Sequence, residues 1–395
     1  MFQIEDSNFI TTWRTNKKNE INLPLDKDGT YDFLVDWGDD TKNHITSWKQ
    51  KEITHKYEKS GIYKIVISGI INGFGFQLDN KFYDLINADL QYKTIVNYKN
   101  NLPNIYFLDI KQWGNVKLHN KGFQFFLTEN LKDFSATDNP DLSNITNAEG
   151  MFEYSSSFNG NIKKWNTSTF ENISRMFYKA EYFDQDISYW NVSNVKDMSF
   201  TFYNASAFNQ PLEKWNTKNV NDMCFMFYGA TSFNQPLESW NVSNVINMGD
   251  MFNLSVSFNQ PLESWNVSSV IDMSYMFSEA YEFNQPLNNW NVSKVTNMNH
   301  MFYKAKKFNQ PIDLWNMKNV YDISHMFSQT DSFDQDLNDW NVSNVQDMSW
   351  IFSHANAFDQ DISSWEINFN AIIDFMFDNS PANKRYIIKR SFTII

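Results

Sequence analysis

The sequence predicts a repeat solenoid of 25-residue coils, each with a short strand and a short helix, preceded by a small antiparallel β-sandwich. Tryptophan returns every 25 residues at Trp165, Trp190, Trp215, Trp240, Trp265, Trp290, Trp315, Trp340 and Trp365. Phenylalanine holds a second column at the same spacing, from Phe158 to Phe358. Before these columns, the chain alternates apolar and polar residues as half-buried strands do. A unit this short cannot bury its apolar side alone, so the coils must stack.

The first element in chain order is the small β domain, over residues 1–75. Alternation predicts strands over 31–37, 53–57 and 61–67, with a turn at Gly38-Asp39-Asp40. Residues 76–126 show no clear period and are predicted to connect the two parts, with degenerate coils among them. We place the 25-residue repeats at 127–380 and a capping tail at 381–395, because terminal repeats must close the stack.

Within one coil, the sequence predicts a helix of about ten residues from its spacing and its capping residues. Asn194 is placed to cap it, with Asp197 three residues on as in a capping box. The apolar residues of the helix recur on one stripe, at Val195, Met198, Phe202 and Ala205. The segment from 208 to 215 is too short and too marked by proline for a second helix, and is predicted to form a turn and a short strand.

The repeat unit Phe-Asn-Gln-Pro-Leu-x-x-Trp-Asn-Val-Ser-Asn-Val-x-x-Met-x-x-Met-Phe is nearly intact at 233–252 and 258–277. It resembles the repeat of BspA-type leucine-rich-repeat surface proteins of bacteria, many of them mycoplasma lipoproteins. The run Asp36-Trp37-Gly38-Asp39-Asp40-Thr41, followed by His55-Lys56-Tyr57, resembles the polycystic-kidney-disease (PKD) type β-sandwich, with Asp40 where that motif has glycine. The resemblance implies a leucine-rich-repeat-like solenoid with a role in surface attachment or host interaction.

Charge narrows the class of partner. The chain of 395 residues has a formal net charge of −13; residues 1–122 carry 16 basic and 15 acidic side chains, and residues 123–395 carry 17 and 31. The repeats therefore hold the whole excess, and they repel phosphate backbones and anionic lipid head groups over about 8 Å at physiological salt. Nucleic acid is a poor candidate partner.

Signals for export and for cysteine chemistry are weak. No apolar run is long enough to span a bilayer, and residues 1–6 lack the pattern of a secretory signal. Cys224 is the single cysteine, which excludes an intramolecular disulfide, a cysteine-based zinc site and an N-terminal lipid anchor. A cell-surface or secreted location is expected from the family resemblance alone, and the cytoplasm stays open.

The candidate binding residues lie on the outer side of the predicted helix. The position two after Met198 faces away from the apolar stripe, and its column reads Phe200, Phe225, Asp250, Tyr275, His300, His325, Trp350 and Phe375. Three positions further on come Tyr178, Tyr203, Tyr228 and Tyr303. Contiguous exposed aromatic residues mark interaction patches. We predict that the aromatic residues and histidines from 200 to 350, with the four tyrosines, bind a partner; the alternative is that neighbouring coils cover them.

A second column, Glu213, Glu238, Glu263 and Asp313, is expected to be solvated, either as a face for a basic partner or as a plain polar surface. The Asn and Asp residues at 197, 222, 247, 272, 297, 322 and 347 are interpreted as helix caps rather than calcium ligands. His300 and His325 lie in adjacent coils, but no third metal ligand stands in their column.

No catalytic, phosphate-binding or dinucleotide motif occurs in the sequence, so we predict no enzyme activity and no cofactor. The predicted function is a non-enzymatic surface or secreted protein that mediates adhesion or protein interaction through its repeats, with host surface or matrix proteins as candidate partners. The alternative is a purely structural spacer or coat protein without a specific ligand. The oligomeric state stays open.

Overall fold

The computed structural model describes residues 6–78, 80–87, 99, 102–384 and 390–391. The chain divides into two compact units, residues 1–194 and 195–395. Most of the predicted capping tail lies outside the described residues. No helix in the described part of the chain is long and apolar enough to cross a membrane.

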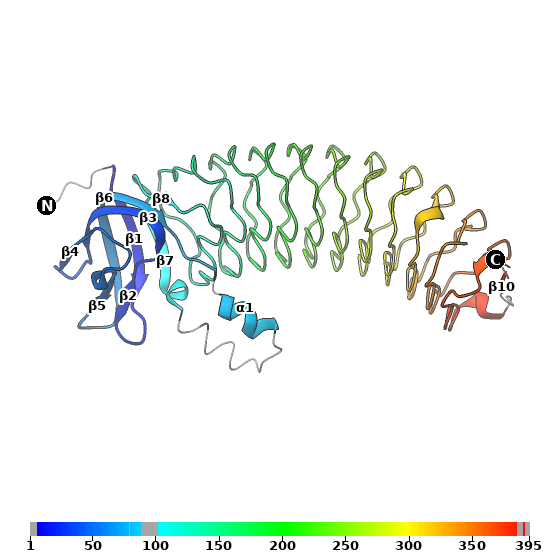
Figure 1. The fold of residues 1–395 in the computed structure, drawn as a ribbon. Helices are drawn as coiled ribbons and strands as arrows, with labels where there is room; N and C mark the ends of the chain where they lie inside the picture. Colours follow the sequence, from blue (N-terminus) through cyan, green and yellow to red (C-terminus); the bar gives the residue numbers. More distant parts are fainter. Residues whose placement is uncertain (1–5, 79, 88–98, 100–101, 385–389, 392–395) are drawn as a thin grey trace. The chain divides into compact units, whose positions relative to one another are not determined.

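The first unit opens with an antiparallel sheet, shown in blue to cyan in Figure 1. The strand order across it is β4 (Lys42–Ile45), β3 (Leu25–Asp36), β6 (Ile62–Phe74), β1 (Phe9–Arg14) and β7 (Phe107–Gln112), with β8 (Lys117–Leu118) pairing parallel to β6. A second pair joins β2 (Glu20–Asn22) to β5 (Thr54–Lys56). A short helix, α1 (Asn80–Asn87), follows β6.

Alternation explains the strands of this sheet. In β3, Tyr31, Phe33 and Val35 are buried, whereas Leu34 between them is exposed. The buried faces meet in an aromatic core, where Trp13 and Phe107 contact edge to face at 4.7 Å. The strands predicted over 31–37 and 61–67 overlap β3 and β6, and β7 and β8 extend the sheet beyond residue 75.

The repeats form coils in both units, and within each unit successive coils are joined by hydrogen bonds. In the first unit, Phe152 donates its amide to the carbonyl of Met176, and its ring stacks on Phe177 with centroids 5.7 Å apart. In the second unit, isolated parallel bridges join residues about 25 apart, from Asp197 to Ile372. Stacked 25-residue coils are therefore present in each unit.

The predicted leucine-rich-repeat-like solenoid, with a strand and a helix in every coil, is wrong. The described residues of the coils contain no α-helix. Most of the β-strands belong to the antiparallel N-terminal sheet (Figure 1). The described repeats contain two short regular elements. One is a 3-10 helix at Met317–Asn319, and the other is the two-residue strand β9 (Ile367–Asn368), which pairs parallel to β10 (Arg390–Ser391). No strand forms over 208–215 either.

Backbone hydrogen bonding shows why the helix does not form. The amides of Met198, Phe200 and Phe202 donate to carbonyls 24 residues further on, in the next coil. Between them, the amide of Thr201 donates to the carbonyl of Met198, three residues back, and the amide of Ser199 donates to the side chain of Asp197. Phe200 has φ of +57°, a left-handed conformation that an α-helix cannot contain. Each coil is therefore a series of turns that still buries Met198 and Phe202.

The predicted helix caps are turn residues. Asp197 accepts a hydrogen bond from the amide of Ser199 at 2.9 Å, and Asp222 and Asn247 do the same two residues on, as in Asx turns. Asn194 does not cap a helix, because its side-chain amide donates to the carbonyl of Ser168 in the preceding coil.

Tryptophan contributes both a hydrogen bond and apolar packing at its position in each coil. Trp290 is 2% exposed, and its indole Nε1 donates to the carbonyl of Leu262, 28 residues earlier, at 2.9 Å. The same bond recurs from Trp240 to Trp365. Indoles also stack along the column, with Trp290 and Trp315 centroids 6.5 Å apart. The indole fills the core and satisfies a buried carbonyl at each step.

Candidate functional site

The candidate binding surface is the predicted outer column, which we call the ring column: Phe200, Phe225, Asp250, Tyr275, His300, His325, Trp350 and Phe375. All eight residues lie in the second unit and have φ between 54° and 59°. This conformation is costly for residues other than glycine, by about 1 kcal/mol or more each. The left-handed conformation stands where the sequence predicted a helix with these side chains pointing outward. The column still lies at the surface, because seven of its members are half-buried and Phe375 is 59% exposed.

The rings of the column stack on one another. Phe200 and Phe225 have centroids 4.6 Å apart and planes within 7°. A second run is longer: the centroid distances are 4.3 Å from Tyr275 to His300, 4.4 Å to His325, 5.8 Å to Trp350 and 4.3 Å to Phe375. Ring faces within each run are therefore covered by other rings, which leaves ring edges as the surface that faces outward.

The predicted tyrosines divide between the two units. Tyr203 and Tyr228 stack at 4.5 Å and flank the first run of rings, with Tyr203 5.9 Å from Phe200. Tyr303 contacts His300 at 5.4 Å and accepts a hydrogen bond from Gln329 on its hydroxyl. These three widen the ring column on one side.

Tyr178 belongs to the first unit and has other neighbours. Its ring lies 5.5 Å from that of Tyr154, and the guanidinium of Arg175 lies 4.3 Å above its centre. Arg175 also pairs with the buried carboxylate of Glu153 at 2.7 Å. Tyr178 is thus held in a local cluster of a ring, a guanidinium and a carboxylate.

The two histidines stack face to face, with planes 18° apart. Imidazole binds a metal through the ring nitrogens, in the plane of the ring, so this stacking does not make the pair a chelate. Among the described residues, no group of three or more His, Cys, Asp or Glu side chains is placed to hold a metal ion. Burial, and next the neighbouring His325, lower the pKa of His300 to about 4.

The His300 pKa predicts how acid affects stability. His300 is neutral in the fold, and its buried Nδ1 finds no hydrogen-bond partner among the described residues. A histidine in the unfolded chain has a pKa near 6.5, so the unfolded chain binds the proton first as the pH falls. The contribution of neutral His300 to the free energy of unfolding is therefore full above pH 6.5 and is lost as the pH falls toward 4. Because the ring is partly solvated, we expect the wild type to lose about 1–2 kcal/mol more than His300→Phe over this range in urea titrations. Equal losses in the two proteins would contradict this.

Asp250 is the member of the column that sequence reasoning left without a role. Its Oδ1 accepts a hydrogen bond from the side chain of Asn253 at 2.8 Å, and its carboxylate makes no ion pair with any described residue. Burial raises the pKa of Asp250 to about 6, and the nearby Asp272 adds to the effect. The available signal was a single carboxylate in a column otherwise made of rings.

The predicted acidic column is a solvated surface. Glu213, Glu238 and Glu263 are exposed and Asp313 is half-buried. Amide side chains from neighbouring positions contact two of them: Asn289 donates to Glu263 at 2.6 Å, and Asn288 donates to Asp313 at 3.0 Å.

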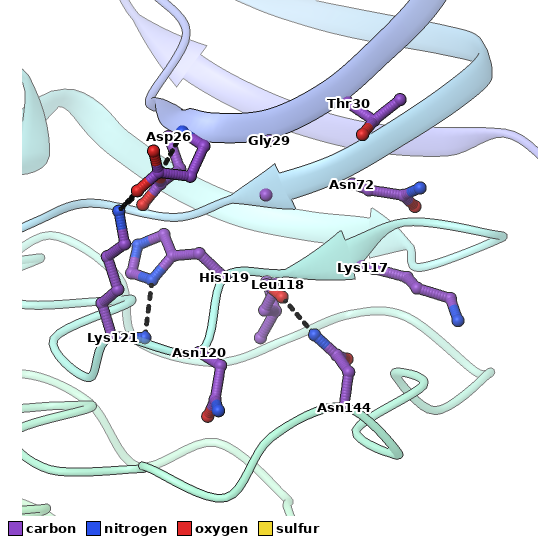
Figure 2. A pocket seen from close by; sticks show the side chains of 12 residues that line it. Asp26, Gly29, Thr30, Asn72, Lys117, Leu118, His119, Asn120, Lys121 and Asn144 are labelled. Carbon is purple, nitrogen blue, oxygen red and sulfur yellow. Dashed lines mark hydrogen bonds and ion pairs between the residues drawn. The ribbon is translucent and has the colours of Figure 1, made fainter.

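A cavity of about 290 Å³ lies within the first unit, between the sheet and the first coil (Figure 2). Three of its charged side chains pair with one another, and Lys117 pairs with Asp141 outside the lining. Lys121 donates to the buried carboxylate of Asp26 at 2.8 Å and to Asp28, and His119 donates through Nε2 to the carbonyl of Phe76 at 2.7 Å. Burial lowers the pKa of His119, which favours its neutral form. These contacts tie the sheet to the segment that enters the coils, and sequence reasoning did not foresee them.

Comparison with known proteins identifies the repeats. Three overlapping stretches, residues 121–228, 210–310 and 284–389, match the family described as "Mycoplasma protein of unknown function, DUF285". Together they cover more than half of the chain. No curated protein and no solved structure matches the sequence.

Proposed function

Because this chain belongs to the family of Mycoplasma proteins of unknown function, DUF285, whose repeats fill residues 121–389, we propose that it is a non-enzymatic surface repeat protein that binds a protein partner through its ring column. A surface or secreted location and the absence of enzyme activity are parts of this proposal. So is adhesion to a host surface or matrix protein as the process that the binding serves.

One observation carries the proposal: the rings at the left-handed positions stack on each other at the surface instead of filling the core. Phe252, Phe277 and Phe302 are fully buried and already form the core column. Tyr275 and Trp350 add nothing to that core, and their partly exposed apolar area remains available to a partner. Clustered aromatic residues supply most of the binding energy in protein interfaces.

The N-terminal sheet supports the surface location. The residues of the PKD-like motif gather in one cluster: buried Trp37 stacks on His55 at 4.8 Å, and the Tyr57 hydroxyl donates to the carbonyl of Trp37. His55 also bonds Asp39 at 2.8 Å. Asp40, which replaces a motif glycine, has φ of +67°, a conformation that Asp tolerates better than most residues. We propose that this sheet, with β7 and β8 as its added strands, is a PKD-like domain that accompanies the repeats as in BspA-type surface proteins.

The experiment compares two triple variants of the full chain. We expect Phe225→Ala, Tyr275→Ala and Trp350→Ala together to reduce binding to immobilised host extracellular-matrix proteins at least about tenfold, because aromatic anchors cost about 2 kcal/mol or more each when truncated. The matched control, Glu213→Gln with Glu238→Gln and Glu263→Gln, should bind as the wild type does. A stiff spacer would bind nothing in any form, and a ring variant that unfolds would show that these rings belong to the core.

A further inference from the structure

The ring column is interrupted once, at Asp250. On one side Phe225 stacks on Phe200, with the planes within 7°. On the other side Tyr275 stacks on His300, with the planes within 8°. Between them, Asp250 presents a carboxylate where every other member of the column presents a ring. The faces of Phe225 and Tyr275 that point toward position 250 therefore have no column ring against them among the described residues.

The interruption has the dimensions of one planar group. Successive rings of the column lie 4.3–5.8 Å apart, so Phe225 and Tyr275, which are two steps apart, are separated by roughly 9–12 Å. A flat group stacked between two rings needs about 7 Å, which is twice a van der Waals contact of about 3.5 Å. A carboxylate is much smaller than a ring and fills less of this space than a ring would.

The charge in the interruption is not balanced within the described part of the chain. The carboxylate of Asp250 accepts one hydrogen bond, from the side chain of Asn253, and forms no ion pair with a described residue. Its neighbour Asp272 is also acidic, and burial is the main reason why the pKa of Asp250 is raised. A half-buried carboxylate without a counter-ion is unfavourable, and a cation supplied from outside would offset that cost.

We propose that the space between Phe225 and Tyr275 binds the guanidinium of an arginine side chain from the protein partner, with Asp250 as its counter-ion. Guanidinium is planar, so it can stack on both ring faces while its N–H groups bond the carboxylate. A lysine ammonium is not planar and makes only part of this set of contacts. The excess of 31 acidic over 17 basic side chains in residues 123–395 favours a basic partner. This inference rests on the proposed function, since the arginine belongs to the partner of the ring column.

The chain contains an example of the same chemistry. Arg175 occupies the equivalent repeat position in the first unit, 25 residues before Phe200, with φ of +59°. Its guanidinium lies over the ring of Tyr178 and pairs with Glu153. A ring, a guanidinium and a carboxylate are thus already combined at this position of the repeat, with the arginine supplied by the chain itself.

The test titrates the full chain with the capped peptide Gly-Arg-Gly and, separately, with its lysine and citrulline counterparts, followed by calorimetry. The arginine peptide should bind at least about fivefold more tightly than the lysine peptide, and the uncharged citrulline peptide should not bind measurably. Equal binding of the arginine and lysine peptides would overturn the proposal, because it would indicate general attraction to an acidic surface.

Three variants locate the binding. Asp250→Asn should weaken binding of the arginine peptide at least about tenfold. Asp347→Asn, the same change in a turn of another coil, should leave that binding unchanged. Asp250→Phe places a ring in the interruption and should abolish binding; phenylalanine already occupies this backbone conformation at Phe200. Both Asp250 variants should be at least as stable as the wild type at pH 7, so that loss of binding is not loss of folding. Unchanged binding in Asp250→Asn overturns the proposal.

Trp350→Ala separates the two proposals. Trp350 lies in the ring column, several coils away from Asp250. If both proposals hold, Trp350→Ala weakens binding to matrix proteins and leaves binding of the arginine peptide unchanged. If the chain binds the peptide and no matrix protein, the proposed function fails while the guanidinium site stands. If matrix proteins bind and the peptide does not, the guanidinium site fails.

Discussion

Replacing Trp290 with alanine is expected to cost about 3–5 kcal/mol of unfolding free energy. The side chain is 2% exposed and packs between Phe277, 6.3 Å away, and Trp315. Truncation leaves a cavity, which neighbouring coils can fill only by moving out of register. It also removes the indole N–H that donates to the Leu262 carbonyl, so that a buried acceptor loses its partner. Urea unfolding followed by circular dichroism measures the loss.

Two control variants separate the contribution of the indole N–H from that of packing, and a core indole from a surface indole. Trp290→Phe keeps a ring but no N–H donor, and should lose an intermediate amount, about 1–3 kcal/mol. Trp350→Ala removes an indole from the ring column instead of from the buried tryptophan column, and should cost about 1 kcal/mol. If Trp350→Ala were as damaging as Trp290→Ala, the ring column would be a structural core and the proposed binding surface would lose its support.

Asn284→Ala should cost about 2–3 kcal/mol, although it removes only a small polar side chain. The Asn284 Oδ1 accepts hydrogen bonds from the amide of Asn309 at 2.9 Å and from the side chain of Gln310 at 3.0 Å, both in the next coil. Alanine leaves the Asn309 amide without this acceptor and leaves Gln310 with only its bond to the Asn284 carbonyl at 3.2 Å, and each partly buried hydrogen bond that is lost costs about 1 kcal/mol or more. Thermal and urea unfolding of the full chain measure the change.

The matched control is Asn291→Ala. Asn291 is exposed and accepts one hydrogen bond, from the amide of Ser293 within its own coil. Its loss should cost less than about 1 kcal/mol, because water can replace the side chain. Equal effects of the two variants would show that the contacts between coils contribute no more than a surface turn does.

Stacking was predictable from the sequence, and the conformation of each coil was not. The 25-residue spacing of Trp215, Trp240 and their counterparts requires one core column whatever the backbone does. The spacing of Val195, Met198, Phe202 and Ala205 fits a helical stripe, but successive three-residue turns bury the same residues. Apolar periodicity alone does not distinguish these cases, and the helix was the wrong choice.

The distinguishing signal was the low helix propensity of the polar residues. Asn, Asp and Ser at positions such as Asp197 and Ser199 bond the backbone locally and favour turns. The ring column was identified because its position two after Met198 points outward in either geometry. Its division at Asp250 was visible in the sequence, but the burial of that carboxylate and the stacking on both sides follow only from the contacts between coils.

The central claim is that each coil consists of turns with a left-handed residue at the ring column. Nuclear magnetic resonance on the deuterated chain, with selective protonation at the α carbons, tests it most directly at Tyr275, His300 and His325. We expect a strong amide-to-Hα Overhauser effect within each of these residues, as left-handed φ brings the two protons close. Weak intraresidue effects and helical Cα shifts across 273–280 would contradict the account.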